Sequence, residues 1–171
     1  MEDPSTEAFR DAQDSLSRGI GCLSEIADKL RHQSGEVSTS ELQHVFEWLV
    51  SEVLFQTAKE EQQLYPLVDL LIAEHGRATT TMVMDHVEIR EKVRGFGEAV
   101  ASLVSSSGGH DTEDLRDRIR VLAYQLEALI SLHVQKDQQV YLGIVEQYAS
   151  HGGVDQLADR DRRAGGEDGQ Q

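Results

Sequence analysis

Apolar residues recur every three or four positions along four long stretches of this chain, and that spacing constrains the fold more than any other feature. It places apolar side chains on one face of an α-helix, whereas a strand would need alternation at every second position. Only two prolines, Pro4 and Pro66, occur in 171 residues, so almost the whole chain is free to be helical. The sequence predicts four helices, with stripes over residues 9–30, 42–71, 82–103 and 115–148.

Short polar segments separate the four stretches, and four amphipathic helices with short connections are typical of a four-helix bundle. We therefore expect an all-α, antiparallel up-down bundle over residues 1–150. Ser38, with Glu41 three residues later, forms a capping-box pattern, so the second helix is expected to begin there. Residues 151–171 are polar and rich in glycine, and we expect them to form a largely disordered tail.

The charge of the chain narrows the class of protein. The sequence holds 16 Lys and Arg residues against 31 Asp and Glu residues, a formal net charge of −15. Nucleic-acid binding needs clustered basic residues and an anionic membrane repels an acidic protein, so we expect neither partner. No apolar run approaches the roughly 18 residues of a transmembrane helix, and residues 1–10 lack the layout of a signal peptide. A single cysteine, Cys22, excludes an internal disulfide, so a soluble cytoplasmic domain is predicted.

Six strongly polar residues fall on the otherwise apolar helix faces, at one level of the predicted bundle. Gln56 and Glu60 are four residues apart, as are His133 and Asp137, so each pair projects from one side of its helix. A buried carboxylate without a partner costs several kcal/mol, comparable with the stability of a whole domain. This polar layer must therefore hold a cation or take up protons. Its members are Gln13, Gln56, Glu60, His86, His133 and Asp137.

The two halves of the chain resemble each other weakly, as in a helix hairpin used twice. Equivalent positions of the two hairpins then share one level of the bundle. The paired positions are Gln56 with His133 and Glu60 with Asp137 at a shift of 77 residues, and Gln13 with His86 at a shift of 73. Beyond the polar layer, the second and fourth helices are expected to bury the next residues of each stripe: Leu64, Leu67, Leu71, Val140 and Ile144.

Two interpretations of the polar layer stay open at this point. One is a buried network in which His133 is charged against Asp137 and His86 against Glu60, with the glutamines as further donors. The other is a metal site, because two histidines with two carboxylates are a ligand mixture that divalent iron, manganese or zinc accepts. Glu61 lies about 100° round the helix from Glu60 and is expected to face solvent.

Three segments of the chain resemble the hemerythrin-like (HHE cation-binding) family. The first is similar to the family's pattern of a histidine, three residues, a glutamate and a leucine-aromatic-proline ending, and the third is similar to its second copy. The segments are Lys59-Glu60-Glu61-Gln62-Gln63-Leu64-Tyr65-Pro66, Asp85-His86-Val87-Glu88-Ile89-Arg90 and Leu132-His133-Val134-Gln135-Lys136-Asp137-Gln138-Gln139-Val140-Tyr141-Leu142. The resemblance extends over about Phe9–Tyr148 and implies the same bundle topology.

The resemblance implies a non-haem di-iron centre at the polar layer. Glu60 and Asp137 match the carboxylates that bridge the two metals, and His86 and His133 match terminal ligands of one of them. The chain departs from the family pattern at two positions that hold the histidines of the other metal. These positions are occupied by Gln13 and Gln56.

Three arrangements follow from this depleted ligand set. The first is a mononuclear site made by His86, His133 and Asp137, with Glu60 as a further ligand. The second is an unequal dinuclear site whose second metal is held by Glu60, Asp137, Gln56 and water. The third is a metal-free relic with a salt-bridged layer.

The resemblance implies one or two iron ions, with manganese or zinc as alternatives, and dioxygen or another small molecule as the partner at the metal. The function implied is metal binding in dioxygen, nitric oxide or peroxide response, or in iron handling. One alternative is a dioxygen-activating oxidase or oxygenase acting on a small substrate, and another is a metal-free protein-interaction module. No catalytic residue is assigned, and a homodimer stays open as an alternative to a monomer.

Overall fold

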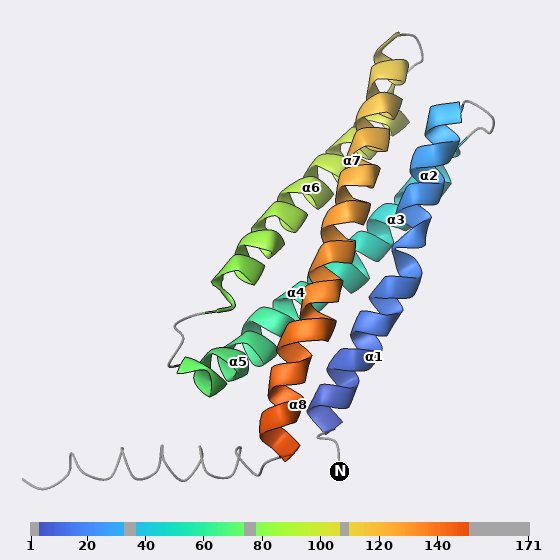
Figure 1. Ribbon diagram of the computed structural model, residues 1–171. Coiled ribbons are helices and arrows are strands. Elements are labelled where there is room, and N and C mark those ends of the chain that lie inside the picture. Colours follow the sequence, from blue (N-terminus) through green and yellow to red (C-terminus); the bar gives the residue numbers. More distant parts are fainter. Residues whose placement is uncertain (1–3, 33–36, 74–77, 107–109, 151–171) are drawn as a thin grey trace, which may run out of the picture.

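The computed structural model describes residues 4–32, 37–73, 78–106 and 110–150, which form four helical rods (Figure 1). Every regular element in those ranges is a helix, so the predicted all-α up-down bundle is confirmed. The tail predicted over residues 151–171 lies outside the described ranges. No helix in the described part of the chain is both long enough and apolar enough to cross a membrane.

The rods follow the four predicted stretches. The first contains α1 (Pro4–Gly19) and α2 (Gly21–His32), and the second contains α3 (Thr39–Trp48), η1 (Leu49–Leu54), α4 (Phe55–Lys59), η2 (Glu60–Leu64) and α5 (Tyr65–Leu71). The third is α6 (Thr80–Ser105), and the fourth contains α7 (His110–Lys136), η4 (Asp137–Tyr141) and α8 (Leu142–Ser150). The helix α7 packs against both α6 and α2, and α6 also packs against α3. Neighbouring rods run in opposite directions (Figure 1).

The capping box predicted for the second rod is confirmed. The backbone N–H of Glu41 donates to Ser38 Oγ at 3.2 Å, and the backbone N–H of Ser38 donates to Glu41 Oε2 at 2.8 Å. The bond from the Ser38 backbone, together with the Lys29 ammonium group, lowers the pKa of Glu41 to about 2. These reciprocal bonds satisfy two of the N–H groups that every helix start leaves free, and thereby fix where α3 begins.

Two apolar clusters lie on either side of the polar layer along every rod. The larger apolar cluster fills the bundle between α2, α3, η1, α6 and α7, where Leu23, Leu42, Phe96 and Leu126 are fully buried. The smaller apolar cluster lies where α1, α5 and α8 come together (Figure 1). Its buried members are Phe9, Leu64, Tyr65, Val68, Leu71, Met82, Tyr141, Leu142 and Val145.

The segments labelled η are π-helical. Two of them, η2 and η4, each begin at a carboxylate of the polar layer. The backbone N–H of Tyr65 donates to the carbonyl of Glu60, and the N–H of Leu142 donates to the carbonyl of Asp137, five residues earlier in both cases. A π-helical turn holds one residue more than an α-helical turn, so the buried face moves by one position. π-Helical turns of this kind are frequent at functional sites.

This extra residue corrects part of the predicted apolar stripes. Leu64 and Leu71 are buried as expected, but Leu67 and Ile144 are only half-buried. The prediction for Val140 was wrong, because its side chain is 48% exposed. The α-helical spacing used in the prediction does not hold through a π-helical segment. The residues buried instead are Tyr65, Val68, Tyr141, Leu142 and Val145.

Candidate metal centre

The structure brings all six predicted members of the polar layer together in the interior of the bundle. None of these side chains is more than 4% exposed. They come from six different elements, so the layer exists only when all four rods are assembled. The residues are Gln13 on α1, Gln56 on α4, Glu60 at the start of η2, His86 on α6, His133 on α7 and Asp137 at the start of η4.

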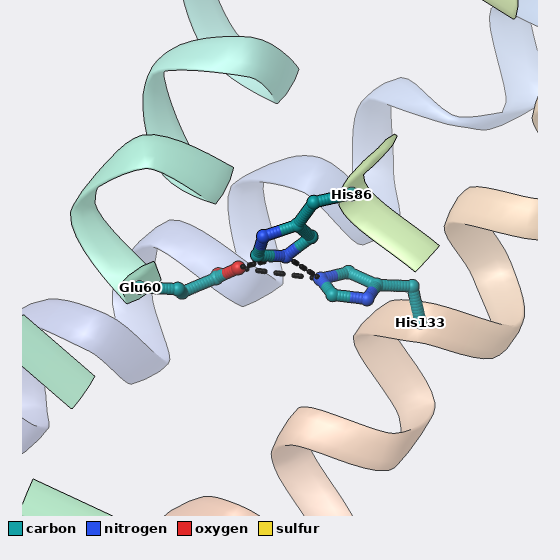
Figure 2. A group of neighbouring side chains, drawn as sticks. All are labelled: Glu60, His86 and His133. Carbon is teal, nitrogen blue, oxygen red and sulfur yellow. Dashed lines mark hydrogen bonds and ion pairs between the residues drawn. The ribbon is translucent and has the colours of Figure 1, made fainter. Parts of the chain in front are cut away.

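Three ligand atoms from three rods converge at the centre of the layer (Figure 2). The Nε2 atoms of His86 and His133 are 3.0 Å apart. Each of them lies 3.2 Å from Oε2 of Glu60. Two histidines and one carboxylate on three different helices are a ligand set found in non-haem iron sites.

The spacing of these three atoms fits a single metal ion. Zinc and similar divalent ions bind nitrogen and oxygen ligands at about 2.0–2.2 Å. Two such ligands at right angles around one ion are therefore about 3.0 Å apart. The separations of 3.0, 3.2 and 3.2 Å are close to that value. An ion held by these three atoms would keep coordination positions for other ligands.

Asp137 lies beside this group of three. Its Oδ2 atom is 3.2 Å from His133 Nε2, and its Oδ1 atom accepts a hydrogen bond of 3.2 Å from the Tyr65 hydroxyl. Burial raises the pKa of Asp137, the negative charge of Glu60 raises it further, and the hydrogen bond with His133 offsets only part of this. A neighbouring cation would therefore stabilise the ionised form of Asp137, which burial and the charge of Glu60 disfavour.

Gln13 and Gln56 lie in the layer as predicted, with their amide nitrogens toward the carboxylates. Gln13 Nε2 donates to Glu60 Oε1 at 2.6 Å and to Asp137 Oδ2 at 3.0 Å. Gln56 Nε2 donates to Glu60 Oε1 at 2.9 Å. In this arrangement both glutamines act as hydrogen-bond donors rather than as ligands through their carbonyl oxygens.

His133 supplies the positive charge that balances the two carboxylates of the layer. Burial disfavours its charged form, but the hydrogen bonds and charges of Asp137 and Glu60 outweigh burial and raise its pKa to about 9. Burial alone would raise the pKa of Glu60, yet the hydrogen bonds from His133 and His86 bring it below its usual value. Without a metal, the proton on His133 supplies the positive charge that these carboxylates need.

Tyr65 is a member of the site that sequence reasoning did not identify as one. Its hydroxyl lies 3.2 Å from His86 Nε2 as well as 3.2 Å from Asp137 Oδ1, and its ring stacks on that of His86. Burial, together with the charges of Glu60 and Asp137, strongly raises the pKa of Tyr65, so the phenol keeps its proton. The motif containing Tyr65 was visible, but the π-helical turn that aims it into the layer was not.

A second carboxylate stands behind each histidine. Glu61 Oε1 is 2.8 Å from His86 Nδ1 and accepts a further bond of 2.8 Å from Arg90, so the expectation that Glu61 simply faces solvent was wrong. With a metal at the centre, a proton on Nδ1 donated to Glu61 would leave Nε2 of His86 with its lone pair toward the metal. On the other side, Asp85 Oδ2 is 3.9 Å from His133 Nδ1 and is paired with Lys136 at 2.6 Å.

Two buried polar atoms in the layer lack a hydrogen-bond partner among the described residues. They are Gln13 Oε1 and His133 Nδ1. Leaving such an atom unsatisfied costs about 1–3 kcal/mol. Unsatisfied buried groups are rare in cores that only stabilise a fold, and they are more usual at functional sites.

Comparisons with known proteins agree with this description. Residues 5–163 match the family described as the hemerythrin HHE cation binding domain. Comparison with curated proteins and with solved structures gave no significant match. The family match covers nearly the whole described chain, and its expected helical bundle and cation-binding character correspond to the fold and to the cluster of Glu60, His86 and His133. The chain therefore belongs to the hemerythrin family of HHE cation-binding domains.

Proposed function

We propose that this chain binds a divalent transition metal, with iron as the preferred candidate, through His86, His133 and Glu60. Asp137 is the adjacent ligand. The observation that carries the proposal is the convergence of three ligand atoms, 3.0–3.2 Å apart, in an otherwise apolar interior. Two imidazoles and carboxylate oxygens are accepted by iron, and manganese and zinc accept them as well.

The charge of the layer supports a divalent ion. Glu60 and Asp137 contribute two negative charges when ionised, and neutral imidazoles contribute none, so one divalent cation makes the centre neutral. The surrounding charges are already matched, because Glu61 is paired with Arg90 and the Asp85 carboxylate with Lys136. A neutral centre avoids the penalty of several kcal/mol that an uncompensated buried charge carries.

The partner at the metal is proposed to be small. The layer side chains are 0–4% exposed, which favours dioxygen, nitric oxide or peroxide over a bulky organic substrate. A bound iron ion would supply redox chemistry and open coordination positions at this point. The chain's own residues orient and protect it: Glu61 holds the His86 ring, Tyr65 offers a hydroxyl proton beside Asp137 Oδ1, and the two apolar clusters exclude water. The role proposed is in dioxygen, nitric oxide or peroxide response, or in iron handling.

The test is metal analysis of protein produced with iron present, compared with a His86→Ala/His133→Ala double variant. We expect bound iron in the unaltered protein, and an electron paramagnetic resonance signal when nitric oxide is added to its iron(II) form. Both are expected to be absent in the double variant. His44→Ala is the matched control, because His44 is exposed and lies outside the layer. Equal metal content in all three proteins would remove the basis of the proposal.

A further inference from the structure

The two glutamines of the polar layer approach Glu60 from one side, and the two histidines approach it from the other. Its Oε1 atom accepts both amide groups, at 2.6 Å from Gln13 and 2.9 Å from Gln56. Its Oε2 atom faces both imidazoles, at 3.2 Å from each Nε2 atom. One carboxylate thus has a side free for a metal and a side already occupied by neutral N–H donors.

Asp137 does not divide its contacts in this way, because its Oδ2 atom accepts the amide of Gln13 at 3.0 Å and also lies 3.2 Å from His133 Nε2. The amide nitrogen of Gln13 lies between the two carboxylates, because it donates to Asp137 Oδ2 at 3.0 Å as well as to Glu60 Oε1. A cation placed between two carboxylates would make the same two contacts. The amide makes them without bringing a net charge into the core.

The internal repeat allows the glutamine positions of the first hairpin to be compared with the histidine positions of the second. Gln56 precedes Glu60 by one helical turn, as His133 precedes Asp137, and both carboxylates begin a π-helical segment. Gln13 corresponds in the same way to His86. Amides therefore stand in one hairpin where imidazoles stand in the other, around a pair of carboxylates that both hairpins share.

The orientation of Gln13 favours a donor role. Rotating its amide by half a turn would place Oε1, a partial negative charge, against Glu60 and Asp137. The structure instead leaves Oε1 buried without a partner among the described residues and directs Nε2 to both carboxylates. The charge balance agrees, because a second divalent cation would add two positive charges for which the described layer has no further anion.

We propose that the amide groups of Gln13 and Gln56 occupy the position of a second cation, so that this centre is built for a single divalent transition metal. The inference rests on the proposed binding of the first metal by His86 and His133. It assigns the glutamines a role as determinants of metal stoichiometry, in which they donate to the shared carboxylates and do not ligate a metal.

The experiment exchanges the same two residue types in opposite directions in the two hairpins. Purified metal-free proteins are titrated with Co(II) and followed by visible absorption, and bound metal is counted by elemental analysis after gel filtration. We expect one Co(II) per chain for the unaltered protein, two for Gln13→His/Gln56→His and none for His86→Gln/His133→Gln. A Gln63→His/Gln125→His control, at two exposed positions, should stay at one.

The outcomes separate the two proposals. Two ions in the unaltered protein, or one ion in a folded Gln13→His/Gln56→His variant, would overturn the role of the amides while leaving metal binding intact. No ion in the unaltered protein would overturn both. If circular dichroism shows the double variant to be unfolded, Gln56→His alone carries the test. It is expected to give a second, weaker binding step, and a single step would contradict the inference.

Discussion

The larger apolar cluster and the polar layer occupy the same bundle but are held together by different forces. In the larger apolar cluster, aliphatic and aromatic side chains such as Leu42, Phe96 and Leu126 are fully buried, and no ligand is needed. In the polar layer, buried carboxylates, imidazoles and amides satisfy one another incompletely, and two atoms lack a partner among the described residues. The difference teaches that the level that stabilises this fold is separate from the level that holds the candidate metal centre.

The largest expected effect lies in the larger apolar cluster. Phe96 is fully buried there, and Phe96→Ala is expected to lower the free energy of unfolding by about 3–5 kcal/mol through lost burial and the cavity left behind. Because this cluster does not depend on a ligand, the loss should be the same with and without metal, as measured by urea unfolding. Phe55→Ala is the control, because Phe55 is 60% exposed and its loss should stay within about 0.5 kcal/mol. A loss at Phe96 that depends on metal would contradict the contrast.

The next effect tests the polar layer by pH. The pKa of His133 is about 9 in the folded protein against an ordinary 6.5, so its proton stabilises the fold. That contribution is complete below pH 6.5 and is lost as the pH rises to about 9. Metal-free protein should lose about 3 kcal/mol over this interval in urea unfolding at fixed ionic strength.

Two comparisons sharpen the pH prediction. Metal-free His133→Gln should lack this pH dependence, because glutamine does not titrate. Metal-loaded protein should lack it as well, since an imidazole nitrogen bound to a metal does not take up a proton. A flat profile for the unaltered metal-free protein would show that His133 is not the counter-charge of the layer.

Tyr65 and Tyr141 allow a narrower comparison within the smaller apolar cluster. Both are buried and both donate a hydrogen bond, from Tyr65 to Asp137 Oδ1 at 3.2 Å and from Tyr141 to the Ala78 carbonyl at 3.0 Å. Tyr65→Phe should cost about 2 kcal/mol because its acceptor is charged, and Tyr141→Phe about 1 kcal/mol. Only Tyr65→Phe should change the visible spectrum of the Co(II)-loaded protein. An equal spectral change in both variants would contradict the assignment of Tyr65 to the metal centre.

The smallest effect concerns the start of the second rod, remote from the polar layer. Ser38→Ala removes the acceptor of the Glu41 N–H and should cost about 1 kcal/mol. The affinity for Co(II) should be unchanged, because the cap lies beyond the larger apolar cluster. A change in Co(II) affinity would mean that the two levels of the bundle are coupled. Glu41→Gln is a second variant of the same cap.

Residue spacing predicted the rods and the membership of the polar layer, because both depend on the helical period and on the cost of burying charge. Gln13, His86 and Asp137 were found in this way, and each is fully buried. Spacing could not predict Tyr65 or Glu61. Their positions depend on the π-helical segment η2, and a pattern of three- and four-residue steps does not predict such a segment.

The pairing of hydrogen-bond donors with the two carboxylates was also beyond sequence reasoning. A glutamine on a core face is compatible with ligation through oxygen and with donation through nitrogen. The choice depends on where the second carboxylate lies, and Glu60 and Asp137 are brought to Gln13 Nε2 from rods that are far apart in the chain. Only the assembled bundle decides it.

The π-helical segment at Glu60 means that part of the centre is encoded by chain length rather than by side-chain identity. Deleting Gln62, which is exposed, would return this turn to ordinary α-helix and keep Tyr65 on the face that it now occupies, because the π-helical turn holds one residue more than an α-helical turn. A one-residue deletion in an ordinary α-helical stretch between two ligands would instead rotate everything after it by about 100°, and the later ligands would leave the layer although all of them were retained. Insertions and deletions near the centre are therefore as informative as substitutions, and a relative can lose the site while keeping every ligand.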